Sequence, residues 1–200
     1  VDQFFVSAPD LKEVVLWSEC DAASAILFYA HRDARVKGVV LLNPWVRTQE
    51  GEAKAILRFY YLQRIMQPSF WKKVLRFDFN PIASVQAALK LMRLSRVPTP
   101  ASMAQQGAAS GAAMSRDMPL PERLLLGITR FSGPVMLVLS GRDLIAREFE
   151  GLVRDHSAWQ AQFRLKPVTQ HALADADHTF SSASQRNQVA DWGLRWLATW

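Results

Sequence analysis

The fold of this chain is decided by residues 13–24, Glu-Val-Val-Leu-Trp-Ser-Glu-Cys-Asp-Ala-Ala-Ser. The first part, Glu13 to Trp17, is a short run of mostly apolar, β-branched residues, which predicts a strand buried on both faces. Residues 22–30 are rich in helix formers and carry apolar side chains on successive turns. The only cysteine of the chain, Cys20, is therefore expected on a tight turn from a strand into a helix.

Strands and helices alternate along the rest of the chain. Two further apolar runs, 36–42 and 134–139, predict buried strands, and 163–168 predicts a last strand at the edge, because Pro167 cannot donate to a ladder. Helices are expected over 121–131, with Pro121 in the first turn, over 145–159, and from 184 to the end. One face of the last helix is expected to dock on the sheet and consists of Val189, Trp192, Trp196, Leu197 and Trp200. This order predicts an α/β fold, a mostly parallel sheet with helices on both faces.

The long middle segment interrupts this alternation. Residues 51–96 have helical character, whereas 97–121 are rich in Ala, Ser, Gly and Pro and predict a loop. We therefore expect three parts: core residues 1–50, a helical lid or cap insertion over 51–130, and core residues 131–200. The sequence starts at Val1 within a helical pattern, without an initiator Met or a helix cap. The N-terminal strands of the sheet are therefore expected to be missing.

Composition restricts the class of protein. The 200 residues carry a formal charge of +6, and the arginines are spread along the chain rather than gathered in a tract. No nucleic-acid-binding motif is present, so a nucleic-acid partner is not expected. No apolar run is as long as the roughly 18 residues of a membrane span. One cysteine excludes an internal disulfide and suits a reducing, cytoplasmic location. The sequence leaves the oligomeric state open.

Cys20 is the candidate nucleophile. A nucleophile elbow needs small residues two positions before and two after the reactive one, and Ser18 and Ala22 meet this requirement. The start of a helix is expected to stabilise a thiolate, and the Asp21 backbone N–H to serve as an oxyanion donor. The second oxyanion donor is expected in the missing N-terminal part. The alternative is that Cys20 is an inert, buried, small hydrophobic residue.

The other members of a catalytic triad are expected in the order nucleophile, acid, histidine. Asp143 follows the strand 134–139, and His178 lies in the loop after the last strand, so both face the sheet edge where Cys20 emerges. Asp175 and Asp177 are alternative acids, although each is very close to His178 in sequence. The other histidines, and Ser18 and Ser24 as nucleophiles, are weaker candidates. No metal site and no cofactor are expected, since no His, Cys and carboxylate cluster has ligand spacing.

Several motifs resemble those of the exosortase A system-associated hydrolases, a bacterial family within the α/β-hydrolases. The similarity extends over essentially the whole chain and includes residues 17–24, 39–47, 60–61, 70–73, 140–143 and 177–180. The resemblance implies an α/β-hydrolase fold, a cysteine nucleophile at Cys20 with Asp143 and His178, and a link to bacterial exopolysaccharide systems. The chain departs from the family in carrying Ser18 where the elbow tends to begin with glycine.

The expected function is hydrolysis or acyl transfer on an ester or thioester, with a small-molecule or lipid-like acyl substrate. Aromatic residues of the lid are candidates to line the acyl pocket, although packing of the lid on the core is the usual role of such residues. The candidates are Phe59, Tyr60, Phe70, Trp71 and, in addition, Met92. The alternative is a non-catalytic protein of the same fold that binds a partner or a lipid or glycan carrier.

Overall fold

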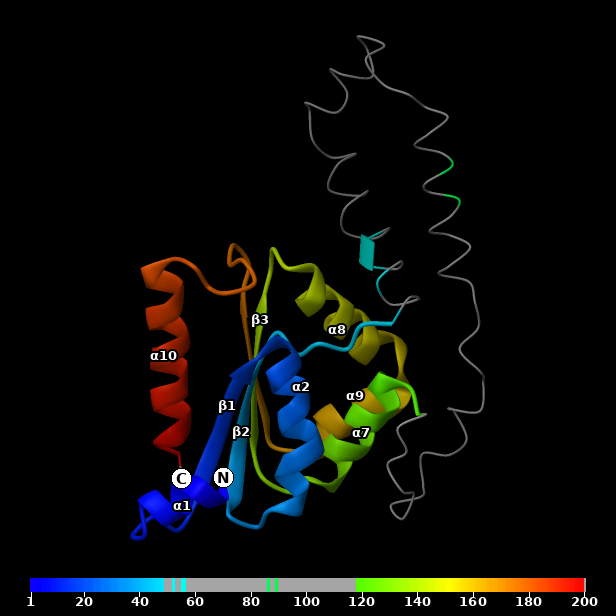
Figure 1. Cartoon of the computed structure of the whole chain (residues 1–200). Coiled ribbons are helices and arrows are strands. Elements are labelled where there is room, and N and C mark those ends of the chain that lie inside the picture. Colours follow the sequence, from blue (N-terminus) through cyan, green and yellow to red (C-terminus); the bar gives the residue numbers. More distant parts are fainter. Residues whose placement is uncertain (49–51, 53–54, 57–85, 87–88, 90–117, 200) are drawn as a thin grey trace.

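The computed structural model describes residues 1–48, 52, 55, 56, 86, 89 and 118–199 (Figure 1). Its strands are β1 (Val14–Glu19), β2 (Val36–Leu42), β3 (Val135–Ser140) and β4 (Val168–Leu173). Its helices are α1 (Asp2–Ser7), α2 (Cys20–Tyr29), the 3-10 turn η1 (Ala30–Arg32), α7 (Leu120–Arg130), α8 (Leu144–Asp155), α9 (Ser157–Leu165) and α10 (Ala183–Leu197). The predicted strands 36–42 and 134–139 and the predicted last helix are confirmed.

The four strands form one parallel sheet in the order β1-β2-β3-β4. β3 is buried along its whole length and β2 nearly so, as their uninterrupted apolar sequences predict. β1 differs, because it is only half-buried and its Trp17 is 44% exposed. The prediction that this strand is buried on both faces is therefore wrong within the described residues, where β1 is an outer strand of the sheet.

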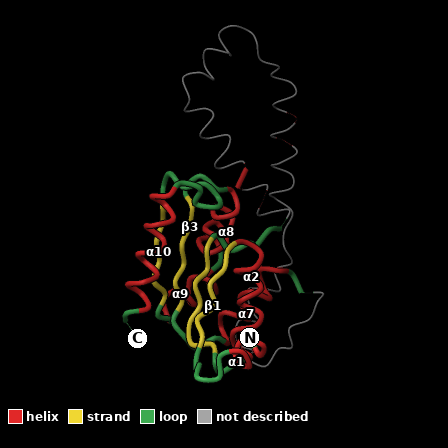
Figure 2. The backbone as a smooth tube through the Cα atoms, turned by 60° about the vertical axis from the view of Figure 1, so that its left-hand side comes forward, coloured by secondary structure: helices red, strands yellow, loops and turns green. Residues whose placement is uncertain are grey.

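Helices cover both faces of the sheet, as predicted. α10 lies on one face, and α2, α7, α8 and α9 lie on the other (Figures 1 and 2). The larger core cluster fills the space under these four helices and includes Leu27, Ile128 and Trp159. The smaller cluster lies under α10 and includes Val189 and Trp196, two residues of the predicted docking face. A third residue of that face, Leu197, is 40% exposed, and Trp200 lies outside the described residues.

Two boundaries in the second half differ from prediction. The chain over 145–159 forms parts of two helices, α8 and α9, which meet at His156. The predicted strand 163–168 is wrong, because α9 continues to Leu165 and β4 begins only at Val168. Phe163 packs its ring edge-on against Phe149, with 6.1 Å between ring centroids, which holds this turn of α9 in the core. Pro167 precedes the strand and leaves its ladder intact.

The predicted lid, 51–130, lies mostly outside the described residues. At its C-terminal end, α7 packs against α2 and α9 and places Leu124 and Ile128 in the core. At the other end, the chain leaves the core beside α8, where the Thr48 backbone N–H donates to Glu148 Oε1 at 3.0 Å. None of the helices in the described part is long and apolar enough to cross a membrane.

Candidate active site

The turn from β1 into α2 has no intervening loop residue, and Cys20 occupies it with a φ of 57°. A left-handed backbone is costly for a side chain other than Gly, Asn or Asp, so the surrounding structure must hold Cys20 in this conformation. Asn43 and Phe180 are the other non-glycine residues with positive φ in the described ranges. Asn43 directly follows β2, and Phe180 lies two residues after His178. Backbone strain is thus concentrated beside the predicted site residues.

The loop after β2 holds the elbow in place. The Trp45 backbone N–H donates to the carbonyl oxygen of Cys20 at 3.2 Å. The Ser24 hydroxyl donates to the carbonyl oxygen of Trp45 at 2.6 Å. Ser24 is 2% exposed and engaged in this contact, so it serves the structure of the elbow rather than offering a free hydroxyl.

The carboxylate of Asp143 lies at the N-terminus of α8, where it accepts hydrogen bonds from the backbone N–H groups of Ile145 and Ala146, each at 3.2 Å. Its side chain is 9% exposed. Nδ1 of His178 lies 2.8 Å from Asp143 Oδ2. Because an ionised carboxylate only accepts, Nδ1–H is the donor, and Nε2 is left to accept a proton. The structure therefore brings the predicted acid and base into direct contact.

The alternative acids are engaged elsewhere. The Asp177 carboxylate accepts hydrogen bonds from the backbone N–H of Ser181, at 2.9 Å, and from its hydroxyl. Asp175 contributes a backbone contact, in which its carbonyl oxygen accepts from Gln185 Nε2 at 3.2 Å. Neither carboxylate replaces Asp143 as the hydrogen-bond partner of the His178 ring.

The remaining histidines lie away from this pair. His156 is exposed at the start of α9. His171 stacks on Trp192 of α10, with 4.2 Å between ring centroids. His31 belongs to the 3-10 turn that follows α2.

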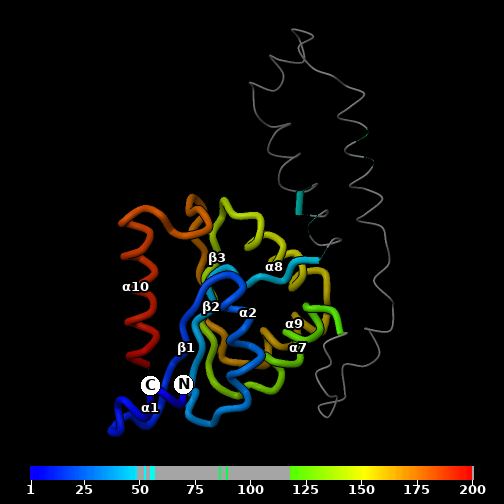
Figure 3. Tube along the Cα trace, in the orientation of Figure 1, coloured from blue at the N-terminus to red at the C-terminus, as the bar shows by residue number. Residues whose placement is uncertain are grey.

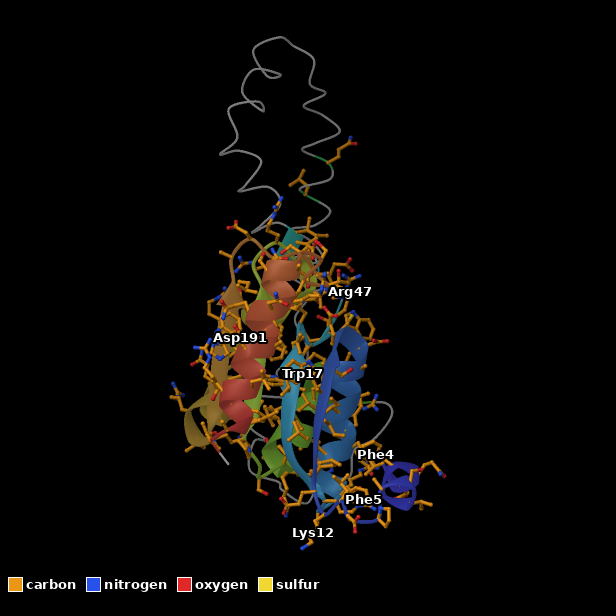
Figure 4. The ribbon with its side chains drawn as sticks, turned by 90° about the vertical axis from the view of Figure 1, so that its left-hand side faces the viewer. Phe4, Phe5, Lys12, Trp17, Arg47 and Asp191 are labelled. Atoms are coloured by element: carbon orange, nitrogen blue, oxygen red, sulfur yellow. The ribbon has the colours of Figure 1, made fainter. Side chains whose placement is uncertain are left out.

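The carboxyl ends of the strands, with the elbow and the loop before α10, lie at the same end of the described sheet (Figure 3). Arg47 is at this end, whereas Phe4, Phe5 and Lys12 are at the opposite end (Figure 4). Trp17, on β1, lies against Gly193 of α10. The parallel sheet therefore gathers the predicted nucleophile, acid and base along one edge.

The environment of Cys20 opposes ionisation of its thiol. Burial raises the pKa of Cys20 above its usual value, and the negative charges of Asp21, Asp143 and Glu19 raise this pKa further. The Asp21 backbone N–H, which donates to the sulfur, lowers it, but the net direction is upward. These effects act against the expected stabilisation of a thiolate at the start of α2, because burial and nearby carboxylates disfavour the charged form of the thiol.

Two residues beside Cys20, Asp143 and His178 were not identified from the sequence. Glu19 precedes Cys20, and its Oε1 is buried without a hydrogen-bond partner in the described part of the chain. Burial raises the pKa of Glu19, whereas His178 and the Asn43 side chain lower it. Asn43 is 0% exposed. The position of Asn43 directly after a buried strand and before Pro44 could have indicated a structural role, since asparagine tolerates a left-handed turn.

The predicted pocket residues Phe59, Tyr60, Phe70 and Trp71, with Met92, lie outside the described residues. In the residues that are described, no group of three or more His, Cys, Asp or Glu side chains is arranged to hold a metal ion.

Several solved structures are similar to this chain. VinJ matches with a TM-score of 0.50 at 14% identity, over 99% of this chain and 70% of VinJ. A monoacylglycerol lipase of Paleococcus ferrophilus matches with a TM-score of 0.48 at 17% identity, over 99% of this chain and 72% of the lipase. The enol-lactonase of Burkholderia xenovorans LB400 matches with a TM-score of 0.44 at 14% identity, over 98% and 70% of the two chains.

No protein-family model and no curated protein sequence matches this chain. The parallel sheet, the helices on its two faces and the match to VinJ identify an α/β-hydrolase fold.

Proposed function

We propose that this chain is an α/β-hydrolase that cleaves an ester or thioester, or transfers its acyl group, through a triad of Cys20, His178 and Asp143. The observation that supports this most strongly is the pairing of a strained elbow cysteine, with φ of 57°, with a hydrogen-bonded His178–Asp143 pair at the same end of the parallel sheet. A site of this kind suits acyl transfer, because nucleophile, base and orienting acid occupy separate, fixed segments.

The first half of the reaction forms an acyl-enzyme. His178 Nε2 takes the proton from the Cys20 sulfur as the sulfur attacks the substrate carbonyl, and the carbonyl oxygen becomes an oxyanion. The Asp21 backbone N–H donates to this oxyanion, and Asp143 stabilises the imidazolium. Collapse breaks the bond to the alcohol or thiol, which leaves with the proton from His178. Cys20 now carries the acyl group as a thioester.

The second half releases the acyl group. His178 deprotonates water, or another acceptor in a transferase, and that oxygen attacks the thioester carbonyl. The Cys20 sulfur leaves and takes the proton back from His178, so the enzyme is regenerated and a carboxylic acid or a new ester is released. The raised pKa of Cys20 makes the general base necessary, because the thiol is protonated at neutral pH.

The lid and the substrate class are further parts of this proposal. Residues 51–130 would cover the acyl pocket, and Phe59, Tyr60, Phe70 and Trp71 would contact a lipid-like acyl chain. The resemblance to exosortase A system-associated hydrolases supports a role beside bacterial exopolysaccharide export.

Turnover of p-nitrophenyl esters of increasing acyl length, and of acyl thioesters, tests the proposal. We expect wild-type protein to hydrolyse members of at least one series and Cys20→Ala to lower the rate by at least about 10³-fold. Intact-mass spectrometry after rapid quenching should detect an acyl adduct on wild-type protein and none on Cys20→Ala. Ser18→Ala removes the hydroxyl of another candidate nucleophile and keeps a small side chain two positions before Cys20. It is the matched control and should still form the adduct.

Turnover that survives in Cys20→Ala would place the chemistry elsewhere. A chain that forms no adduct and hydrolyses neither series would favour the alternative, a binding protein of the same fold.

A further inference from the structure

The side chain of Asn43 joins the segments that carry the proposed acid and base. Its Nδ2 donates to Ser140 Oγ at 2.8 Å and to the backbone carbonyl oxygen of His178 at 2.7 Å. Its Oδ1 accepts from the Ser140 backbone N–H at 2.8 Å. Asn43 and Ser140 are 0% and 1% exposed, so water does not compete for these bonds.

These contacts bear directly on the His178–Asp143 pair. Ser140 is the last residue of β3, and Asp143 follows it by three positions. The carbonyl that Asn43 holds belongs to His178 itself. One amide group therefore fixes both the start of the loop that leads to Asp143 and the backbone of His178. Nδ2 has two acceptors, Ser140 Oγ and the His178 carbonyl oxygen, so both N–H bonds of the amide are used.

The same turn also contacts the elbow. Asn43 is followed by Pro44, whose ring fixes φ, and then by Trp45, whose backbone N–H donates to the Cys20 carbonyl at 3.2 Å. Two residues of this turn, Asn43 and Trp45, therefore contact all three segments of the proposed triad.

The residue type matches both demands of the position. Asn43 has a φ of 44°, in the left-handed region that asparagine and glycine adopt with little strain. Glycine would satisfy the backbone but remove all three side-chain bonds. Aspartate would keep the acceptor for the Ser140 N–H but would lose the donor to the His178 carbonyl.

We propose that Asn43 is a positioning residue that holds His178 in the orientation in which its Nδ1 meets Asp143. This proposal rests on the proposed function for its catalytic meaning, but its structural content is independent of any substrate. Asn43 acts through His178 and does not contact the reacting atoms.

The test compares Asn43→Gly and Asn43→Asp with two controls. Asn187→Gly makes the same change on the exposed face of α10, and Leu124→Ala destabilises the core under α7. The first measurement is the nitrogen and proton NMR spectrum of ¹⁵N-histidine-labelled protein, in which the hydrogen-bonded Nδ1–H of His178 is assigned with a His178→Ala variant. The second measurement is the kcat and KM of the best ester.

We expect both Asn43 variants to shift or broaden the His178 Nδ1–H signal and to lower kcat about 10- to 100-fold with KM within about 2-fold. Asn187→Gly should change neither quantity. Leu124→Ala should lower the Tm while the His178 signal remains. Asn43→Asp retains the hydrogen bond from the Ser140 backbone N–H. If Asn43→Gly does not fold, Asn43→Asp is compared with wild type instead.

An unchanged His178 signal in a folded Asn43 variant would overturn the proposal, whatever its activity. If wild-type protein shows no Cys20-dependent turnover, the proposed function fails instead. The NMR comparison needs no substrate and still decides whether Asn43 orients His178.

Discussion

Nδ1 of His178 lies 2.8 Å from Oδ2 of Asp143, although 35 positions separate the two residues. The contact follows from the parallel pairing of β3 with β4, in which Ser140 is opposite Leu173, so the loops after the two strands emerge side by side. Two residues that are far apart in the sequence therefore form a direct hydrogen bond.

The first prediction concerns this hydrogen bond. Asp143→Asn should lower kcat about 10²- to 10⁴-fold, because an amide no longer holds the tautomer that leaves Nε2 free or stabilises the imidazolium. Stability should change little, since the amide oxygen still caps α8. Asp177→Asn, the matched control in the same region, should stay within about 3-fold of wild type. An Asp143→Asn variant as active as this control would contradict the assignment of the acid.

The second prediction concerns the approach of the two loops. Gly141 lies so close to the loop after β4 that a β-carbon would come within 2.1 Å of the Ala174 carbonyl oxygen. Gly141→Ala must therefore push the loop that carries Asp143 away from the loop that carries His178. We expect this substitution to lower the Tm and to reduce turnover at least about 10-fold.

Gly151→Ala is the control for this clash, because a β-carbon there meets only the end of the Arg154 side chain, at 3.5 Å. In the middle of α8 it should raise the free energy of unfolding by about 0.5–1 kcal/mol and leave turnover unchanged. Equal effects of the two substitutions on turnover would refute the role given to the close approach at Gly141.

The third prediction concerns the ionisation of Cys20. Because burial and nearby carboxylates raise the pKa of Cys20, the rate of its alkylation by iodoacetamide should rise with pH and reach its midpoint above the ordinary thiol value of about 8.5. Glu19→Gln removes one of the charges that raise this pKa, so its midpoint should lie at lower pH. Glu13→Gln, the same change at the far end of β1, should leave the midpoint in place.

A midpoint well below 8.5 in wild-type protein would indicate a preformed thiolate–imidazolium pair. The thiol would then be activated in the resting state, without proton transfer during attack.

The fourth prediction concerns Glu148, which is 5% exposed. Burial raises its pKa above 4.5, although the Thr48 N–H and Arg47 lower it. The folded state therefore binds this proton more tightly than the unfolded chain, and the free energy of unfolding falls as the pH rises from about 4.5 through the raised value. In Glu148→Gln this fall is absent, while the glutamine oxygen still accepts from Thr48 N–H.

Thermal unfolding of wild type and Glu148→Gln over pH 4 to 8 measures this effect. The Tm of the variant minus that of wild type should increase with pH across the window. Glu150→Gln, the same change in a more exposed carboxylate of α8, is the matched control. A difference in Tm that is constant with pH would show that Glu148 does not titrate in this range.

Local sequence determined the parts of this protein that depend on neighbouring residues. The apolar runs of β2 and β3 predict buried strands, because only a strand covered on both faces tolerates such a run. The small residues around Cys20 predict the elbow, and the positions of Asp143 and His178 after successive strands predict their meeting at one sheet edge. The meeting of Asp143 and His178 can be inferred from the direction of the strands and their order along the chain.

Tertiary structure decided what depends on contacts between distant segments. Phe163 belongs to α9 rather than to a strand, because packing against Phe149 outweighs its β-propensity. Asn43 connects two loops of the site only because β2 and β3 pair. The pKa of Cys20 rises because folding removes water and brings Asp143 close to the thiol. Burial and through-space charge depend on the complete arrangement of the chain, which local sequence patterns do not contain.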